Sequence, residues 1–287
     1  MSRLTRFIRS LPAFPESAWR HSLLPLQQPG FPVAVCWSAK SGCTTVLKWF
    51  LAQTGLLDEA FAYSRWVHDY REHKLFPSPD YLRQCDRIFR GERDDLTVIK
   101  VIRDPATRAV SSFLHFLRCS RGAASWPTAA EANRWKAATG LGSQPGRSFR
   151  QFLLFIADRQ RHRPAVDVHV RPQYDATQDR RVDASIRLED LAAGLASVEE
   201  QHGLPHVDVR RLSLSDHHNP ASADHDWPTV AATFAADHAT LDERGTPPAR
   251  IFLDPETRAL IQSVFAVDYA AYGDFYGAAS PTLRKAA

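Results

Sequence analysis

Apolar residues along this chain fall into two kinds of run, and the order of these runs predicts the fold. Residues 31–37 are a short, valine-rich run, which is typical of a strand buried on both faces in a parallel sheet. Residues 44–54 carry apolar side chains at helical spacing, and Gly55 is a suitable helix end. Small and polar residues at 38–42 join the two runs. This stretch therefore predicts a strand, a tight loop and a helix.

The same order of elements recurs in the next part of the chain. Residues 78–91 predict a helix, and residues 96–102 form a second β-like run. Asp104 and Pro105 follow that run directly and predict the start of another helix. Repeated strand, loop and helix predict a parallel sheet with helices on its faces. The predicted fold class is α/β: a P-loop-like three-layer α/β/α arrangement with a central parallel sheet in a single domain.

Later segments supply further elements of the predicted domain. A strand is predicted over 183–188. Helices are predicted at three more places: 148–159, 189–202 and a segment that begins at Asp254. Residues 212–227 have no clear period and are predicted to form a loop. The chain is divided into an N-terminal arm, one domain and a C-terminal tail: 1–29, 30–277 and 278–287.

Composition is that of a folded domain, and its mild basicity fits an anionic ligand. The chain has 287 residues, of which 44% are hydrophobic, and this is enough for a proper core. The net charge of +4 fits an anionic ligand but is too small to predict nucleic-acid binding. The cysteines are scattered, without the spacing of metal ligands, and are interpreted as small buried fillers in a reducing compartment: Cys36, Cys43, Cys85 and Cys119.

The sequence predicts neither a membrane span nor a secretory signal. No apolar run approaches the length of a span, and the first 20 residues lack the apolar region of a signal peptide. Peripheral membrane contact through Phe7, Ile8 and Leu11 stays open, although an ordinary N-terminal arm is favoured. The predicted location is the cytoplasm, and the oligomeric state is left open. A His- and Asp-rich stretch at 216–226 is interpreted as a solvated loop rather than a metal site.

The first predicted loop has the properties of a phosphate or sulfate site. A loop between a buried strand and a helix exposes backbone N–H groups, and the helix dipole adds positive potential there. Lys40 adds a full charge, while Thr44 and Thr45 add hydroxyl donors. The spacing of a Walker A loop is absent, because the lysine precedes the only glycine. This loop alone fits an ordinary lysine-containing turn equally well.

The second predicted turn favours an anion-binding role over an ordinary turn. Arg103 lies at the end of the second β-like run, and Ser111 follows it by eight residues on the predicted helix. Asp104 is predicted to cap that helix. Two cationic turns after successive parallel strands suit a ligand with two separated anionic groups.

These two segments resemble motifs of the sulfotransferases that use 3′-phosphoadenosine 5′-phosphosulfate (PAPS). Residues 39–45, AKSGCTT, look like the loop that holds the 5′-phosphosulfate, and residues 101–113, VIRDPATRAVSSF, look like the 3′-phosphate motif. Three weaker similarities resemble the carbohydrate (Golgi-type and bacterial) branch: HVRPQ at 169–173, RLEDL at 187–191 and the stretch 265–273. The resemblance runs from about residue 31 to residue 276.

The resemblance implies a donor, an acceptor class and a set of site residues. The enzyme would transfer the sulfuryl group of PAPS to a hydroxyl, most readily of a carbohydrate or glycoconjugate, as a transferase of the EC 2.8.2 type that needs no metal. Lys40 would also stabilise charge on the leaving phosphate. The implied cofactor-binding residues are Lys40, Ser41, Gly42, Cys43, Thr44, Thr45, Arg103 and Ser111.

A hydroxyl acceptor benefits from a general base of near-neutral pKa, and the resemblance places that base between the two phosphate motifs. His68 and His73 are the histidines there, and His68 is preferred because neighbouring aromatic residues would partly desolvate it. The segment around His68 is interpreted as extended, so that the adjacent Asp69 points away. His169 is the reserve candidate.

Two departures from the family pattern and two rival functions stay open. Val46 stands where many cytosolic members have an aromatic residue near the adenine. An Arg-Lys-Gly loop near the C-terminus is not found, and Arg284 and Lys285 are assigned to a loose tail without a binding role. One rival function is a P-loop kinase that acts on a small molecule, although its lysine spacing and its Mg²⁺ carboxylate are missing. The other is a catalytically silent module that binds glycans or nucleotides. A protein tyrosine or a lipid hydroxyl stays open as the acceptor.

Overall fold

The computed structural model describes most of the chain: residues 24–93, 95–119, 147–162, 168–213, 235–236, 245–276 and 283–285. The chain folds into two compact units. Among the described residues, those within 1–103, 173–215 and 273–287 form the first unit, and those within 104–172 and 216–272 form the second. Of the predicted segments, the N-terminal residues before 24 and the His- and Asp-rich stretch at 216–226 lie outside the described residues.

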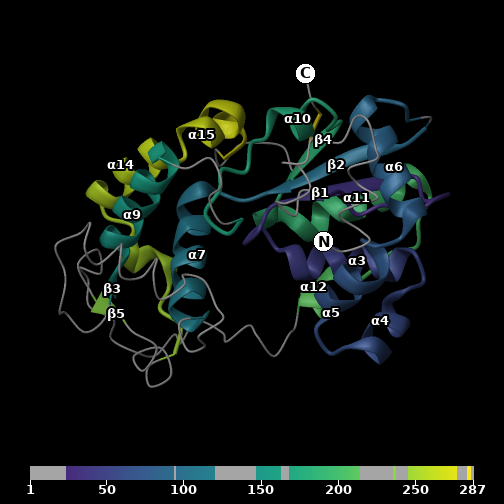
Figure 1. Cartoon of the computed structure of the whole chain (residues 1–287), viewed down its shortest axis with the longest axis horizontal. Helices are drawn as coiled ribbons and strands as arrows, with labels where there is room; N and C mark the ends of the chain where they lie inside the picture. The colour runs from purple at the N-terminus through teal and green to yellow at the C-terminus, as the bar shows by residue number, and fades with distance from the viewer. Residues whose placement is uncertain are drawn as a thin grey trace. The chain divides into compact units, whose positions relative to one another are not determined.

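The first unit is built on a sheet of parallel strands. Strands β1 (Val33–Trp37), β2 (Thr97–Ile102) and β4 (Ala184–Arg187) are parallel neighbours in that order (Figure 1). Strand β6 (Leu283–Lys285) adds an antiparallel edge beside β4. The predicted C-terminal tail therefore contributes a strand to the sheet, and the prediction of a loose tail at Arg284 and Lys285 is wrong.

The register of β1 and β2 fixes where their loops emerge. Trp37, the last residue of β1, pairs with Val101, one residue before the end of β2. Parallel strands that end in register deliver both following loops to one edge of the sheet. The two predicted phosphate-binding segments therefore begin side by side.

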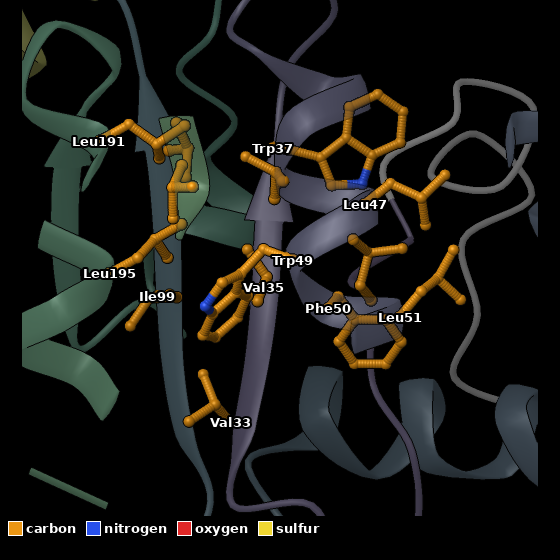
Figure 2. Close-up of a cluster of buried hydrophobic side chains, with 14 of the residues drawn as sticks. Val33, Val35, Trp37, Leu47, Trp49, Phe50, Leu51, Ile99, Leu191 and Leu195 are labelled. Atoms are coloured by element: carbon orange, nitrogen blue, oxygen red, sulfur yellow. The ribbon is translucent and has the colours of Figure 1, made fainter. Parts of the chain in front are cut away.

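One face of the sheet is covered by helices α3 (Cys43–Gln53), α11 (Leu191–His202) and α12 (Val209–Ser213). Figure 2 shows the core between them: alternate β1 side chains, α3 side chains and α11 side chains, including Val33, Val35, Trp37, Leu47, Trp49, Phe50, Leu51, Leu191 and Leu195. Trp49 and Phe50 are completely buried. Apolar residues on both faces explain why β1 has a continuous hydrophobic run.

Helix α6 (Pro79–Arg90) covers the opposite face, where Ala34, Cys36 and Val98 pack with Ile88. Ser78 accepts a hydrogen bond from the Tyr81 amide as the N-cap of this helix, with Pro79 in its first turn. Helices on both faces of a parallel sheet confirm the predicted three-layer α/β/α class.

Between α3 and α6 the chain forms a helical segment that the sequence analysis did not predict. It comprises α4 (Leu57–Tyr63), α5 (Val67–Tyr70) and a π-helical turn, η1 (Arg71–Leu75). The expectation of an extended segment around His68 is therefore wrong. Short elements complete the first unit: α10 (Ala176–Asp179), η2 (Leu188–Asp190) and η4 (Gly273–Tyr276).

The second unit is largely helical. Its elements are α7 (Pro105–Cys119), β3 (Arg147–Ser148), α9 (Phe149–His162), β5 (Ala235–Ala236), η3 (Ala249–Phe252), α14 (Pro255–Val264) and α15 (Ala266–Tyr272). Its core is rich in phenylalanine, and the rings of Phe113, Phe149, Phe152 and Phe252 are all completely buried. The predicted cap at Asp254 is confirmed, because its carboxylate accepts the Thr257 amide at 2.8 Å. Within the described residues, no helix has the length and apolarity that a membrane span requires.

A buried ion pair joins strand β2 to helix α10. Lys100, in the middle of β2, is completely buried, and its Nζ lies 2.6 Å from Asp179 Oδ2 at the end of α10. The same Nζ donates to the Gln173 carbonyl at 2.7 Å. Asp179 also accepts the Asp175 amide at 2.8 Å. These bonds fasten the chain from 173 to 179 onto the central strand.

We expect Lys100→Met to lower the free energy of unfolding by about 3–5 kcal/mol, because Asp179 would keep a buried charge without its cation. Urea denaturation followed by circular dichroism measures this loss. Arg83→Met is the matched control, since Arg83 and Asp80 form an ion pair in which both side chains are more than half exposed, and its loss should cost less than about 1 kcal/mol. Equal effects of the two variants would contradict a structural role for the buried pair.

Candidate functional site

The site begins at the loop 38–42 that follows β1, which we call the first loop. Lys40 and Gly42 both adopt left-handed conformations, with φ of 68° and 74°. Such a conformation is costly for a lysine, so it persists only where surrounding contacts hold it. The Ser41 amide donates to the Ser38 carbonyl at 3.1 Å and closes the turn.

Gly42 is required both by its conformation and by its surroundings. A β-carbon at this position would overlap the Cδ1 atom of Leu188, which lies in η2. Leu188 belongs to the RLEDL stretch, where Arg187 pairs with Asp190. The similarity at 187–191 therefore has a structural meaning: it holds an apolar side chain against the back of the first loop.

Helix α3 begins directly after Gly42. Its first turn contains no acidic residue, and no described side chain caps it. The first backbone N–H groups of a helix have no partner within the helix, and the helix dipole adds positive potential there. Thr44 and Thr45 bring hydroxyl groups to the same turn. The N–H groups at such a helix start are able to bind an anion, and they lie within the segment 39–45 for which an anion site is predicted.

Arg103 follows β2 and is joined to the first loop. Its guanidinium Nη1 donates to the Lys40 carbonyl at 3.0 Å. The side chain is half-buried and comes from the adjacent strand, as the β1–β2 register requires. Lys40 and Arg103, which were predicted from separate motifs, therefore lie together in the first unit.

Gln173 is the residue of this site whose role the sequence analysis did not assign. The sequence analysis noted it only as part of the HVRPQ similarity. The structure buries it, with 2% of its surface exposed, between the first loop and Arg103. Its side chain bonds Ser41 at 2.8 Å and both backbone groups of Arg103 at 2.8 and 2.7 Å. Sequence spacing gave no signal for these contacts, because they join segments 70 and 132 positions apart.

Ser111 lies on α7 in the second unit and is half-buried. The predicted cap of this helix is confirmed, because the Asp104 carboxylate accepts the Thr107 amide at 2.8 Å. The next residue, Ser112, is buried and donates to the His169 carbonyl at 2.6 Å. His169, the reserve base candidate, is also in the second unit, with its ring 4.5 Å from that of His115.

His68 lies in α5 beside the first turn of α3. Only 5% of its surface is exposed, and its Nε2 lies 3.0 Å from the Thr44 hydroxyl. Burial is the main cause that lowers the pKa of His68 to about 3, and the Arg71 charge lowers it further while Asp69 opposes the change. The near-neutral pKa expected of a base is therefore absent from the free protein, where the imidazole is uncharged at neutral pH.

Trp66 stands beside His68 and faces the solvent. Its ring centroid lies 4.6 Å from that of His68, yet 41% of its surface is exposed. The turn that carries it is braced, because Ser64 accepts the Trp66 amide at 3.1 Å and donates to Asp69 at 2.8 Å. An exposed tryptophan in a fixed position next to a buried histidine is a candidate contact for a substrate.

A metal site does not emerge in the part of the chain that the structure describes, since no three potential His, Cys, Asp or Glu ligands gather there. The groups in this part of the first unit that could bind an anion are Lys40, Arg103 and the N–H groups at the start of α3. Their chemistry suits a ligand with phosphate or sulfate groups.

Comparison with known proteins gives one match. A family model described as "Sulfotransferase family" matches residues 28–276, which is most of the chain. No curated protein and no solved structure matches the chain significantly.

The pKa of His68 predicts how stability depends on pH. The unfolded chain takes up a proton at this residue near pH 6.5, whereas the folded protein does so only near pH 3. The contribution is therefore fully present above pH 6.5 and is lost as the pH falls below it, by about 2 kcal/mol between pH 7.5 and pH 5. We expect His68→Gln to remove this part of the pH dependence, measured by urea denaturation at the two pH values.

His73→Gln is the matched control for this measurement, because His73 lies in the same helical segment but is exposed. It should keep the wild-type change in stability between the two pH values. A His68→Gln protein that loses as much stability as wild type on acidification would contradict the buried, neutral state of His68.

Proposed function

Because the chain belongs to the sulfotransferase family, we propose that it transfers the sulfuryl group of PAPS to a hydroxyl of a carbohydrate or glycoconjugate. The observation that carries the proposal is the bond between the two cationic segments, in which Arg103 donates to the Lys40 carbonyl at 3.0 Å. PAPS has two separated anionic groups, and a site with two adjacent cationic segments suits it.

Different residues of the first unit would bind different anionic groups of PAPS. Lys40, Ser41 and the N–H groups at the start of α3 would bind the 5′-phosphosulfate, with Gly42 and Cys43 shaping the backbone and Thr44 and Thr45 donating hydroxyls. Arg103 would bind the 3′-phosphate. That Ser111 also binds this group stays a prediction from the sequence resemblance. A 3′-phosphate is absent from ATP, so the Arg103 contact would also provide selectivity for the donor.

The proposed transfer is in line. The bond from sulfur to the acceptor oxygen forms as the bond from sulfur to the leaving phosphate oxygen breaks, and negative charge develops on that oxygen. Lys40 and the α3 N–H groups stabilise the charge, and no metal is needed for this role. The hydroxyl proton passes to the His68 imidazole, which is neutral and able to accept it.

The low pKa of His68 bears on its role as a base. A buried imidazole with a pKa of about 3 accepts a proton reluctantly. Anionic groups within a few ångströms favour the protonated form of a histidine. Thr44 lies within hydrogen-bonding distance of His68 and belongs to the first turn of α3, which would help to hold the phosphosulfate. The bound donor would therefore raise the pKa of His68, so that the base becomes effective in the complex.

Trp66 supports a carbohydrate as the acceptor. One face of a sugar ring is lined by C–H groups, and an exposed indole offers a flat apolar surface with a polar edge. Because Trp66 is fixed beside His68, a sugar stacked on it would bring a hydroxyl toward the base. The resemblance to the carbohydrate branch points to the same class. Location in the cytoplasm stays a prediction from the sequence.

The donor assignment is tested by calorimetric binding of adenosine 3′,5′-bisphosphate (PAP), the desulfated product, and of ADP, both without metal. We expect wild type to prefer PAP and Arg103→Ala to weaken PAP binding at least tenfold, because a charge-assisted contact to the 3′-phosphate is lost. Arg210→Ala, at an exposed position of α12, is the control and should bind PAP as wild type does. Equal binding of PAP and ADP by wild type would overturn the proposed donor, and Mg²⁺-dependent preference for a nucleoside triphosphate would favour a kinase.

The acceptor assignment is tested by steady-state transfer from labelled PAPS to desulfated glycosaminoglycan oligosaccharides, with a tyrosine peptide as the competing acceptor class. Trp66→Ala should raise the acceptor KM about tenfold, while His68→Ala should lower kcat about a hundredfold. Both variants should keep PAP affinity. Phe61→Ala is the matched control, since Phe61 is a similarly exposed aromatic residue on α4. An unchanged KM in Trp66→Ala, or transfer only to the peptide, would reject the sugar contact.

A further inference from the structure

Gln173 uses its whole side-chain amide to join three separate segments of the first unit. The Oε1 atom accepts from the Ser41 hydroxyl and from the Arg103 amide, each at 2.8 Å. The Nε2 atom donates to the Arg103 carbonyl at 2.7 Å and contacts the Tyr276 hydroxyl at 3.3 Å. The amide therefore bonds the first loop, the end of β2 and η4 at the same time.

Only a glutamine side chain meets this arrangement. The carbonyl oxygen of an amide offers two lone pairs, and its NH₂ group offers two donors. A glutamate would place a second acceptor against the Arg103 carbonyl, and a methionine would leave the Arg103 backbone groups without partners. Because Gln173 is almost completely buried, water would not readily replace the lost bonds.

The backbone of Gln173 is held in place by the buried ion pair of the sheet. Lys100 donates to the Gln173 carbonyl at 2.7 Å and pairs with Asp179 at the end of α10. Neither the Lys100 side chain nor that of Asp179 is more than 11% exposed. The backbone of Gln173 is therefore held in place while its side chain bonds the first loop and Arg103.

The contacts of Gln173 hold the first loop and Arg103, whose positions set the distance between the two proposed anion sites. Ser41 follows Lys40, whose carbonyl accepts the Arg103 guanidinium at 3.0 Å. The Arg103 backbone is held from both sides by the Gln173 amide, and Ser41, which is completely buried, is held by the same oxygen. Movement of one loop would break bonds to the other.

We propose that Gln173 is a positioning residue that couples the first loop to Arg103, so that the two anionic groups of one ligand bind as a unit. The proposal rests on the proposed function, which assigns the 5′-phosphosulfate to the first loop and the 3′-phosphate to Arg103. Without Gln173, each subsite can still bind its own group, but the loss of their fixed spacing reduces the benefit of binding both.

The test compares three ligands by calorimetry: PAP, 5′-AMP and 3′-AMP. In wild type the affinity for PAP should exceed that for either monophosphate by a large factor. Gln173→Met should weaken PAP binding at least tenfold while changing the affinity for each monophosphate less than about threefold. A merely structural role would weaken all three ligands by the same factor, and that result would overturn the proposal.

Two further variants keep the test decisive. Gln178→Met is the matched control, because Gln178 is an equally buried glutamine in α10, and it should leave the ratio of PAP to monophosphate affinity unchanged. Gln173→Asn keeps the amide but is one methylene too short to span both loops, so it should show the same PAP-specific loss if Gln173→Met does not fold. Wild-type affinity ratios in Gln173→Asn, or the same loss in Gln178→Met, would overturn the coupling role.

This result is separable from the proposed function. A wild-type protein that does not prefer PAP to ADP would refute the donor assignment before any Gln173 variant is measured. A wild type that prefers PAP, with Gln173 variants that bind all three ligands in unchanged ratio, would refute only the coupling role.

Discussion

The parallel pairing of β1 with β2 is the constraint on which the site depends. The pairing of Trp37 with Val101 ends both strands at nearly the same level, so the first loop and Arg103 leave the sheet at one edge. Hydrophobic burial on both faces of β1 makes a shift of register costly, since each residue of the strand is buried. The contacts of the first loop, of Arg103 and of Gln173 all follow from this arrangement, and His68 is added beside it by the helical segment that follows α3.

Local sequence signals were sufficient for much of the fold. Strand β1 was predicted from its valine-rich run, α6 from its apolar period and α14 from a capping residue, and these signals act within a few neighbouring residues. The Asp104 cap was predicted in the same way. The first loop was also identified locally, because small residues, a lysine and a following helix start are adjacent in the sequence.

The remaining features depend on contacts between distant segments. Gln173 meets Arg103 across 70 positions, and Lys100 meets Asp179 across 79, so no spacing pattern indicates either contact. A lysine within an apolar strand gives a hint, because a buried cation needs a partner, but the partner is not identifiable from the sequence. His68 was assigned to an extended segment because α4 and α5 are short helices stabilised by packing, as at Ala60 and Val67, rather than by a strong period.

The left-handed conformation of Lys40 has a consequence for the competition between ligands. A loop that already has its conformation in the free protein requires little ordering when an anion arrives, and this would favour any small oxyanion of suitable size. Inorganic phosphate and sulfate would therefore occupy the first loop in proportion to their concentrations. If the proposed donor binds here, its second anionic group, held at Arg103, is what would let it displace these ions, so the concentration of free phosphate would set the background against which this protein has to select.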